Sequence, residues 1–264
     1  MAPLTHSKPV ALITGASSGI GATYADRLAK RGYDLVLVAR DGKRMQALAA
    51  QLHAATAVAI EVLPADLTHH DDLLRVEDYL RSHPEISLLV NNAGASLPGG
   101  FDTSDAETID HLIRLNVTSV ARLSRVALDG LLQHPNGAII NIASVMALAP
   151  ELRSAVYSAT KAFVLTFTQT LQCELEERGL YLQAVLPAAT RTEIWEKSGR
   201  NPDDLQGLME VGDLVDAALV GFDRKEKITI PPLHNEKQWD DYDALRVAML
   251  PGFMQSQPGE RYTR

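Results

Sequence analysis

The sequence predicts an α/β fold with a doubly wound parallel β-sheet and helices on both of its faces. Short apolar runs alternate along the chain with longer stretches that show helical spacing. Most runs carry apolar residues at consecutive positions, as strands buried on both faces do, and this alternation is typical of a parallel sheet. The expected strands are 9–14, 34–39, 57–63, 87–92, 137–143, 180–187 and 227–231, and the expected helices are 19–31, 42–53, 69–82, 104–132 and 155–178.

Length and composition predict a single domain over residues 1–264. A chain of 264 residues that is 46% hydrophobic and 22% charged can bury one sizeable core. It contains no linker, low-complexity tract or internal repeat. We expect the core over about 8–230, with a substrate loop at 188–212 and a tail at 231–264.

The tail carries large apolar side chains at a spacing that predicts a short helix, packed over the site or against another subunit. These side chains are Trp239, Tyr242, Leu245 and Met249. Pro251 and Gly252 are expected to end the helix.

Charge limits the classes of partner. The formal net charge is -8, which argues against nucleic acid because its phosphates require a basic face. The N-terminus has no apolar segment of signal-peptide length, and no run reaches the roughly 18 apolar residues of a membrane span. We therefore expect a cytoplasmic protein with no membrane partner and no metal site. The one cysteine, Cys173, allows no internal disulfide and is expected to be a packed thiol.

The segment ITGASSGIG at 13–21 follows the first expected strand and opens the first expected helix. In a doubly wound sheet a dinucleotide pyrophosphate binds at this turn, because glycines allow close backbone approach and a helix N-terminus offers free N–H groups. Thr14, Ser17 and Ser18 add hydroxyl donors. The expected cofactor contacts here are Thr14, Gly15, Ser17, Ser18, Gly19, Ile20 and Gly21.

The same segment contains Gly15-x-Ser17-x-Gly19, the pattern of a hydrolase nucleophile elbow. That alternative needs an acid and a histidine further along the chain. None of the eight histidines stands in an obvious triad context. The cofactor interpretation is therefore favoured.

The end of the second expected strand indicates which cofactor fits. A carboxylate there would bond the ribose hydroxyls and favour NAD, but the chain has Ala39 followed by Arg40. A guanidinium can make a bidentate contact to a 2′-phosphate. The sequence therefore predicts NADP(H) in preference to NAD(H), unless Arg40 is only a solvated surface residue. Asp41 is expected to cap the next helix.

Polar or special residues end the later strands at the same edge of the expected sheet, where ligands of open parallel sheets bind. Asp66 and Leu67 follow the third strand, and the sequence Asn91-Asn92-Ala93-Gly94 follows the fourth. Ser144 follows the fifth strand and Pro187 the sixth.

The segment YSATK at 157–161 supplies candidate catalytic groups. Tyr157 and Lys161 are four positions apart in a helical stretch, so their side chains share a face. A nearby ammonium lowers the pKa of a phenol, which could then exchange a proton near neutral pH. The hydroxyl of Ser144 could hold a substrate oxygen beside that phenol.

This combination of motifs resembles the classical short-chain dehydrogenase/reductase family over roughly residues 8–230. The matching motifs are Thr14-Gly15-x-x-x-Gly19-x-Gly21, Asp66, Asn91-Asn92-Ala93-Gly94, Asn116, Ser144 and Tyr157-x-x-x-Lys161. The resemblance implies a Rossmann-type sheet of about seven strands in the order 3-2-1-4-5-6-7.

The resemblance also implies a role for each matching residue. Tyr157 would be the general acid in carbonyl reduction, and Lys161 would lower its pKa and bond the nicotinamide ribose. Ser144 would orient the substrate carbonyl, and Asn116 would help to hold a water chain that reaches Lys161. The remaining residues would contact the adenosine half of the cofactor: Asp66 and Leu67 at the adenine, and Asn92, Ala93 and Gly94 at the ribose.

The chain departs from the family after the sixth strand, where Pro187-Ala188 replaces the usual Pro-Gly. Alanine would be strained if this position required a positive φ. Pro187, Thr190 and Thr192 are expected to lie at the nicotinamide and the phosphates.

The substrate pocket is expected to be apolar, which predicts a small-molecule carbonyl or secondary alcohol. Its candidate residues are Leu97, Pro98, Ser144, Met146, Ala147, Tyr157, Ile194 and Trp195, with 196–212 as a lid. No basic cluster indicates a substrate that carries a carboxylate or phosphate. Arg153 and Arg191 are the candidates for such a contact, and the alternative for both is a solvated surface arginine. Family members pair the helices that correspond to 104–132 and 155–178, so a homodimer or homotetramer is expected.

The sequence therefore predicts an NADP-dependent oxidoreductase that transfers a hydride between the nicotinamide and this substrate, with reduction to the alcohol as the expected direction. A non-catalytic NADPH sensor or scaffold on the same fold is the alternative. The Ser144, Tyr157 and Lys161 set counts against it, because a pure binder needs no such phenol.

Overall fold

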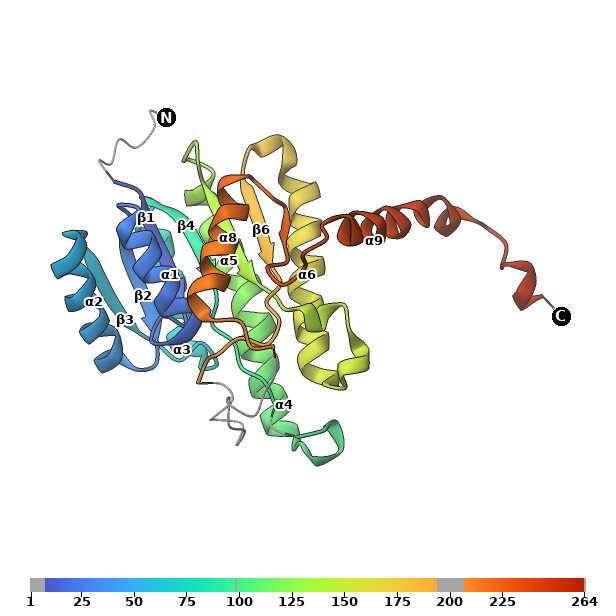
Figure 1. Cartoon of the computed structure of the whole chain (residues 1–264), viewed down its shortest axis with the longest axis horizontal. Helices are drawn as coiled ribbons and strands as arrows, with labels where there is room; N and C mark the ends of the chain where they lie inside the picture. The colour runs from blue at the N-terminus through green and yellow to red at the C-terminus, as the bar shows by residue number, and fades with distance from the viewer. Residues whose placement is uncertain (1–7, 98, 194–206, 264) are drawn as a thin grey trace. The chain divides into compact units, whose positions relative to one another are not determined.

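The computed structural model describes residues 8–97, 99–193 and 207–263, and the chain divides into two compact units (Figure 1). The first unit is Met1–Pro231 and the second is Pro232–Arg264. The first unit contains the whole β-sheet as one α/β domain. The second corresponds to the tail separated in the sequence analysis.

Within the described residues, seven parallel strands form one sheet in the order β3-β2-β1-β4-β5-β6-β7. The expected strand order and the Rossmann-type fold are thus confirmed. Every residue of β4 is buried, because helices cover both faces of the sheet. The strands are β1 (Val10–Thr14), β2 (Asp34–Ala39), β3 (Ile60–Pro64), β4 (Ile86–Asn91), β5 (Ala138–Ile142), β6 (Tyr181–Val185) and β7 (Ile228–Thr229).

Helices pack on the two faces of the sheet through separate apolar clusters. One face is covered by α1 (Gly19–Lys30), α2 (Gly42–Thr56) and α8 (Val211–Asp223). The other face is covered by α3 (His70–Ser82), α5 (Ser119–Leu131) and α6 (Ala155–Leu175). The doubly wound arrangement predicted from the sequence is therefore observed.

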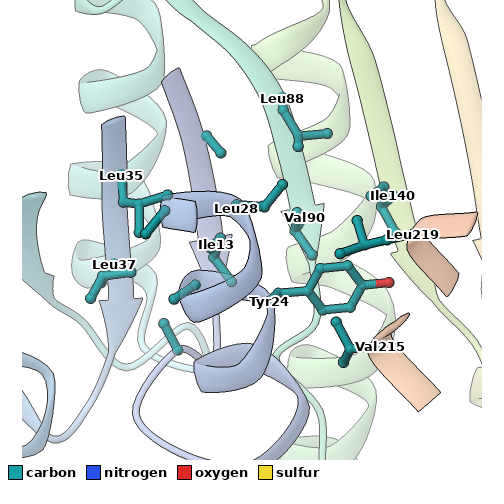
Figure 2. Close-up of a cluster of buried hydrophobic side chains, with 14 of the residues drawn as sticks. Ile13, Tyr24, Leu28, Leu35, Leu37, Leu88, Val90, Ile140, Val215 and Leu219 are labelled. Atoms are coloured by element: carbon teal, nitrogen blue, oxygen red, sulfur yellow. The ribbon is translucent and has the colours of Figure 1, made fainter. Parts of the chain in front are cut away.

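Tyr24 of α1 occupies the centre of the first cluster (Figure 2). Its side chain is fully buried, and it lies beside Val215 and Leu219 of α8. Leu28, one turn further along α1, points toward the strands. This packing fixes α1, whose first turn carries the glycine segment, against the sheet.

Two bidentate ion pairs also join α1 to α8. Arg27 donates to Asp216 from Nε at 2.7 Å and from Nη2 at 3.2 Å. Arg31 donates to Asp223 from its two Nη atoms at 2.8 and 3.0 Å. Arg31 is the C-cap of α1, one turn beyond Arg27, so the two pairs bridge the two helices at successive turns.

The structure differs from the sequence expectations in several elements. The expected helix at 104–132 consists of α4 (Ala106–Ile113), a π-helical segment (Arg114–Thr118) and α5. Helix α8 was not expected as an element, and α6 ends in a short 3-10 turn at Glu176–Arg178. Cys173 is exposed, so the expectation of a packed thiol is wrong.

The second unit contains the expected tail helix as α9 (Lys237–Ala248). The rings of Trp239 and Tyr242 lie 5.5 Å apart between centroids on this helix. Pro251 and Gly252 follow in a 3-10 segment, Leu250–Met254. No helix of the described residues is long and apolar enough to span a membrane.

Candidate active site

The β1–α1 turn forms a cradle of the kind that holds a phosphate. Gly15 and Gly19 have φ values of +67° and +53°, in the left-handed region that side chains rarely adopt. A Cβ atom at Gly21 would stand 2.3 Å from the carbonyl oxygen of Gly15, so only glycine fits there. Ser18 precedes α1 without a side-chain capping bond, which leaves first-turn N–H groups available to a ligand. These features fit the dinucleotide pyrophosphate that was expected here.

The hydroxyl of Thr14 serves the protein rather than a ligand. It donates to the carbonyl of Val90 at 3.3 Å and accepts from the backbone N–H groups of Asn92 and Ala93, both at 3.0 Å. Because a hydroxyl has one proton, Thr14 is not the hydroxyl donor that was expected. Ser17 and Ser18 are half-buried at the turn and Ile20 packs against the core beneath it.

Asn92 ties the end of β4 to the glycine turn. Its Nδ2 atom donates to the carbonyls of Thr14 at 2.8 Å and Gly15 at 3.3 Å. Gly94 lies further along the same segment, where an added Cβ would meet Asn116 Oδ1 and Lys161 Nζ at 3.4 Å each. The segment after β4 therefore runs from the glycine turn to the candidate catalytic residues.

Arg40 and Asp66 lie together at the ends of β2 and β3. Their Nη1 and Oδ2 atoms are 3.7 Å apart, and the Arg40 side chain is 71% exposed. Burial acts to raise the pKa of Asp66, but hydrogen bonds from Thr68 and the charge of Arg40 outweigh it and hold that pKa below its usual value. Leu67 is buried beside them. Asp41 caps α2 by accepting from the N–H of Arg44, as expected.

Ser144 is buried at the end of β5. Its Oγ atom accepts from the N–H of Met146 at 3.1 Å and donates to the carbonyl of Pro187 at 3.2 Å. The contact with Pro187 joins the ends of β5 and β6. Ser144 therefore has the fixed position that orienting a substrate oxygen requires.

Tyr157 and Lys161 share a face of α6, with the Nζ atom 5.8 Å from the centroid of the phenol ring. Nζ donates to the carbonyl of Ile142 at 2.8 Å, and burial lowers the pKa of Lys161 to about 8. Burial also raises the pKa of Tyr157, which its hydrogen bond with Ser144 offsets only in part. Burial therefore dominates the pKa of Tyr157, and the lowering of that pKa by Lys161 stays a prediction.

Asn116 lies in the π-helical segment and is buried. Its side chain accepts from the N–H of Ala95 and donates to the carbonyl of Ala95, both at 3.0 Å. Nδ2 also donates to Oγ1 of Thr160 at 3.0 Å, and Thr160 donates to the carbonyl of Tyr157 at 2.8 Å. Thr160 is thus a positioning residue that the sequence analysis missed, although it lies inside the YSATK segment.

The loop after β6 begins without strain. Among the described residues the non-glycine positions with positive φ are Ala57, Arg153 and Lys225, so Ala188 does not need the conformation of a glycine. Thr190 forms a β-bridge with Met209, and its hydroxyl donates to the carbonyl of Ala188 at 3.0 Å.

Thr192 lies against the glycine turn, where an added Cβ at Gly19 would meet its Cγ2 atom at 3.3 Å. A hollow of about 410 Å³ opens at this contact. Its lining comes from the first turn of α1, the loop after β6 and the start of α8: Gly19, Ala22, Thr23, Arg191, Thr192, Glu193 and Val211. Thr192 therefore lies where a phosphate contact was expected.

The candidate substrate residues are only partly described. Leu97, Met146 and Ala147 are half-buried, whereas Pro98, Ile194, Trp195 and 196–206 lie outside the described residues. Arg191 pairs with Glu210 at 2.9 Å. Arg153 is exposed and has a φ of +55°.

Comparisons with known proteins agree with this geometry. A family described as short chain dehydrogenase matches residues 9–203. The chain is 36% identical over 189 residues to very-long-chain 3-oxoacyl-CoA reductase of Anas platyrhynchos, covering 70% of this chain and 60% of that protein. It is 34% identical over 188 residues to 17-beta-hydroxysteroid dehydrogenase type 3 of Mus musculus, covering 69% of this chain and 60% of that protein. The match thus spans about three fifths of these curated relatives.

Two solved structures are more similar still. A short-chain dehydrogenase from Sphingobium yanoikuyae in complex with NADPH is 53% identical with a TM-score of 0.94, covering 96% of this chain and 99% of that chain. The bulky-bulky ketone specific alcohol dehydrogenase from Comamonas testosteroni is 48% identical with a TM-score of 0.91, covering 98% of this chain and 100% of that chain. With the matching glycine turn and YSATK segment in place, the chain belongs to the short-chain dehydrogenase family.

Proposed function

We propose that this chain is an NADP(H)-dependent oxidoreductase that interconverts a ketone and its secondary alcohol, with Tyr157 as the general acid and base. One observation carries the proposal. The phenol of Tyr157 lies close to two buried groups: the hydroxyl of Ser144, which influences its pKa, and Nζ of Lys161, which is 5.8 Å from the ring centroid. Strand β5 ends just before Ser144, at the same edge of the sheet as the glycine turn that follows β1.

The nicotinamide, when bound, supplies or accepts the hydride. In reduction, the phenol of Tyr157 gives its proton to the carbonyl oxygen of the substrate, and Ser144 holds that oxygen. Burial holds the pKa of Tyr157 above its ordinary value, so the phenol is protonated at neutral pH, which is the state that the acid in carbonyl reduction needs.

Lys161 places a buried amine beside the phenol. The bond to the carbonyl of Ile142 holds Nζ in place, and we assign it the contact with the nicotinamide ribose. Asn116 keeps the segment before α5 against α6 through Thr160, and we assign it the water chain that reaches Lys161.

We assign the preference for NADP(H) to Arg40. Its exposed guanidinium follows a strand that ends in Ala39, so no carboxylate at that strand end competes for the adenosine ribose. The NADPH named with the Sphingobium yanoikuyae structure supports this assignment. Replacing Arg40 by Gln should weaken NADPH binding and leave NADH binding nearly unchanged.

For the substrate we propose a ketone with a large apolar group on each side of the carbonyl. The name of the Comamonas testosteroni enzyme supports this class. The half-buried Met146 and Ala147 beside Ser144, together with the half-buried Leu97 after β4, are the candidates for an apolar surface that takes one such group.

The test is the loss of NADPH absorbance with a panel of ketones whose two substituents grow from methyl to phenyl. We expect turnover that favours two large substituents, prefers NADPH over NADH and disappears in the Tyr157→Phe variant. Turnover that survives this substitution would remove Tyr157 from the mechanism. Tight NADPH binding without turnover of any carbonyl compound would instead support a cofactor sensor.

We also propose that copies of the chain pair through α5 and α6. Phe163 on α6 is 36% exposed, and its ring stacks on that of Phe167 with centroids 5.5 Å apart. Light scattering coupled to size-exclusion chromatography measures the assembly, and a Phe163→Glu variant should shift it toward the monomer.

A further inference from the structure

Arg44 and Glu193 form an ion pair between α2 and the loop after β6. The guanidinium of Arg44 donates from Nη1 to Oε2 of Glu193 at 3.0 Å and from Nη2 to Oε1 at 2.5 Å. The two residues are 149 positions apart in the chain. The parallel, two-point geometry is that of a well-formed guanidinium–carboxylate contact.

Each partner lies beside a different part of the expected cofactor groove. The backbone N–H of Arg44 donates to Oδ1 of Asp41, which follows Arg40 just after β2. Arg44 therefore lies at the end of the expected cofactor groove that would hold the adenosine. Glu193 follows Thr192, which lies against Gly19 in the phosphate-binding turn. The ion pair therefore connects the first turn of α2 to the loop that covers the first turn of α1.

The loop that carries Glu193 is anchored at its base. Thr190 and Met209 form a β-bridge, in which Arg191 N–H donates to Met209 at 2.9 Å and Met209 N–H donates to Ala189 at 3.0 Å. The ion pair of Arg191 with Glu210 reinforces this base. Glu193 thus extends from a fixed stem toward α2.

We propose that the Arg44–Glu193 ion pair closes over a bound dinucleotide between its phosphates and its adenosine, and that the pair sets the rate at which the dinucleotide leaves. This inference rests on the proposed function. Both side chains are partly exposed, at 46% for Arg44 and 36% for Glu193. An exposed pair stabilises weakly, so the closure can open in every turnover.

The proposal predicts equal effects on the two cofactors. A closure over the phosphates shared by NADPH and NADH slows the release of both. A direct contact between Arg44 and the 2′-phosphate would slow the release of NADPH alone. Comparing the two dinucleotides therefore separates a closure from a phosphate contact.

The experiment measures dinucleotide release by stopped-flow, following the fluorescence of the reduced nicotinamide after dilution into excess oxidised cofactor. The variants are Glu193→Gln, Arg44→Gln, the double variant, and the exchanged pair Arg44→Glu with Glu193→Arg. Arg31→Gln is the matched control, because it breaks another exposed bidentate pair, with Asp223, between the C-terminal ends of α1 and α8.

We expect each single variant to release NADPH and NADH about two- to five-fold faster, as the loss of one exposed ion pair allows. The double variant should be no faster than either single variant, because the partners act as a unit. The exchanged pair should restore slow release, and the control should match the wild type.

Faster release of NADPH alone, or unchanged release in both single variants, would overturn the closure while leaving the proposed function in place. A wild-type chain that binds neither dinucleotide would refute the proposed function and the closure together.

Discussion

The side-chain amide of Asn116 donates a hydrogen bond to the hydroxyl of Thr160, with Nδ2 and Oγ1 3.0 Å apart and both residues buried. This bond joins the π-helical segment to α6, one turn after Tyr157 and next to Lys161. Thr160 passes the connection on by donating to the carbonyl of Tyr157. The position of the Tyr157 phenol therefore depends on Thr160, a residue to which no chemical step is assigned.

Replacing Thr160 by Val should destabilise the fold and disturb catalysis. The substitution keeps the shape of the side chain but leaves one donor of the buried Asn116 without its partner, which costs about 1–3 kcal/mol. Urea unfolding measures the free energy of unfolding, and steady-state kinetics measures kcat against KM. Thr160→Ser keeps the hydroxyl and should behave as the wild type; equal losses in both variants would contradict the role of this bond.

Lys161 should make the stability depend on pH between about 8 and 10.5. Its folded pKa of about 8 lies below the ordinary 10.5. Below pH 8 the amine is charged in both states and the cost of burying it is fully present. Between the two values the unfolded chain binds more protons, so the free energy of unfolding rises with pH by about 3 kcal/mol.

The control for that prediction is Lys161→Met, which has no titrating group at this position. The difference in unfolding free energy between wild type and variant should change across this pH range and be flat below it. A constant difference from pH 7 to 11 would show that Lys161 titrates normally.

Replacing Tyr157 by Phe should lower kcat by at least about 100-fold, the usual contribution of a positioned acid. The ring stays in place, so the Kd for NADPH should change little. Fluorescence titration with NADPH checks binding, and the rate with a reactive diketone checks turnover. Loss of binding in parallel with activity would mean that the hydroxyl supports the cofactor site rather than the proton transfer.

Two helical glycines should respond to alanine in opposite ways. A Cβ at Gly21 would stand 2.3 Å from the Gly15 carbonyl, whereas a Cβ at Gly130 would stand 3.6 Å from its nearest neighbour, the Cα atom of Pro84. Gly21→Ala should weaken NADPH binding and lower Tm, because the clash is with backbone. Gly130→Ala should raise stability by up to about 1 kcal/mol, since alanine is the better helix former. A Gly21→Ala variant with wild-type Tm and NADPH affinity would contradict the cradle.

Much of the fold could be predicted because the strands are buried on both faces. Runs such as those of β1 and β4 are apolar at consecutive positions, and they end where the sheet ends. Helix α8 was missed, although Leu214, Val215, Ala218 and Leu219 lie on one face of it and are buried. Residues 196–212 were interpreted as a lid, so the helical spacing of the apolar residues that follow was not used to predict a helix.

Other features could not be predicted because they depend on distant parts of the chain. The π-helical turn at Asn116 gives no local signal. The hydroxyl of Thr14 accepts hydrogen bonds from the backbone N–H groups of Asn92 and Ala93, just after β4. The sequence of the β1–α1 segment alone does not indicate these partners. The rise in the pKa of Tyr157 reflects burial, which spacing in YSATK does not encode.

The contact of Asn92 with the glycine turn bears on how the protein is made. Thr14 and Asn92 are 78 positions apart, so the ribosome releases the turn long before the residue that supports it. A nascent chain that ends before β4 lacks the side chain that holds the carbonyls of Thr14 and Gly15 in place. The cradle is completed only when the central strands have paired. We therefore expect the cradle to bind a dinucleotide only after the sheet has assembled, so that the cofactor would not template the first half of the fold.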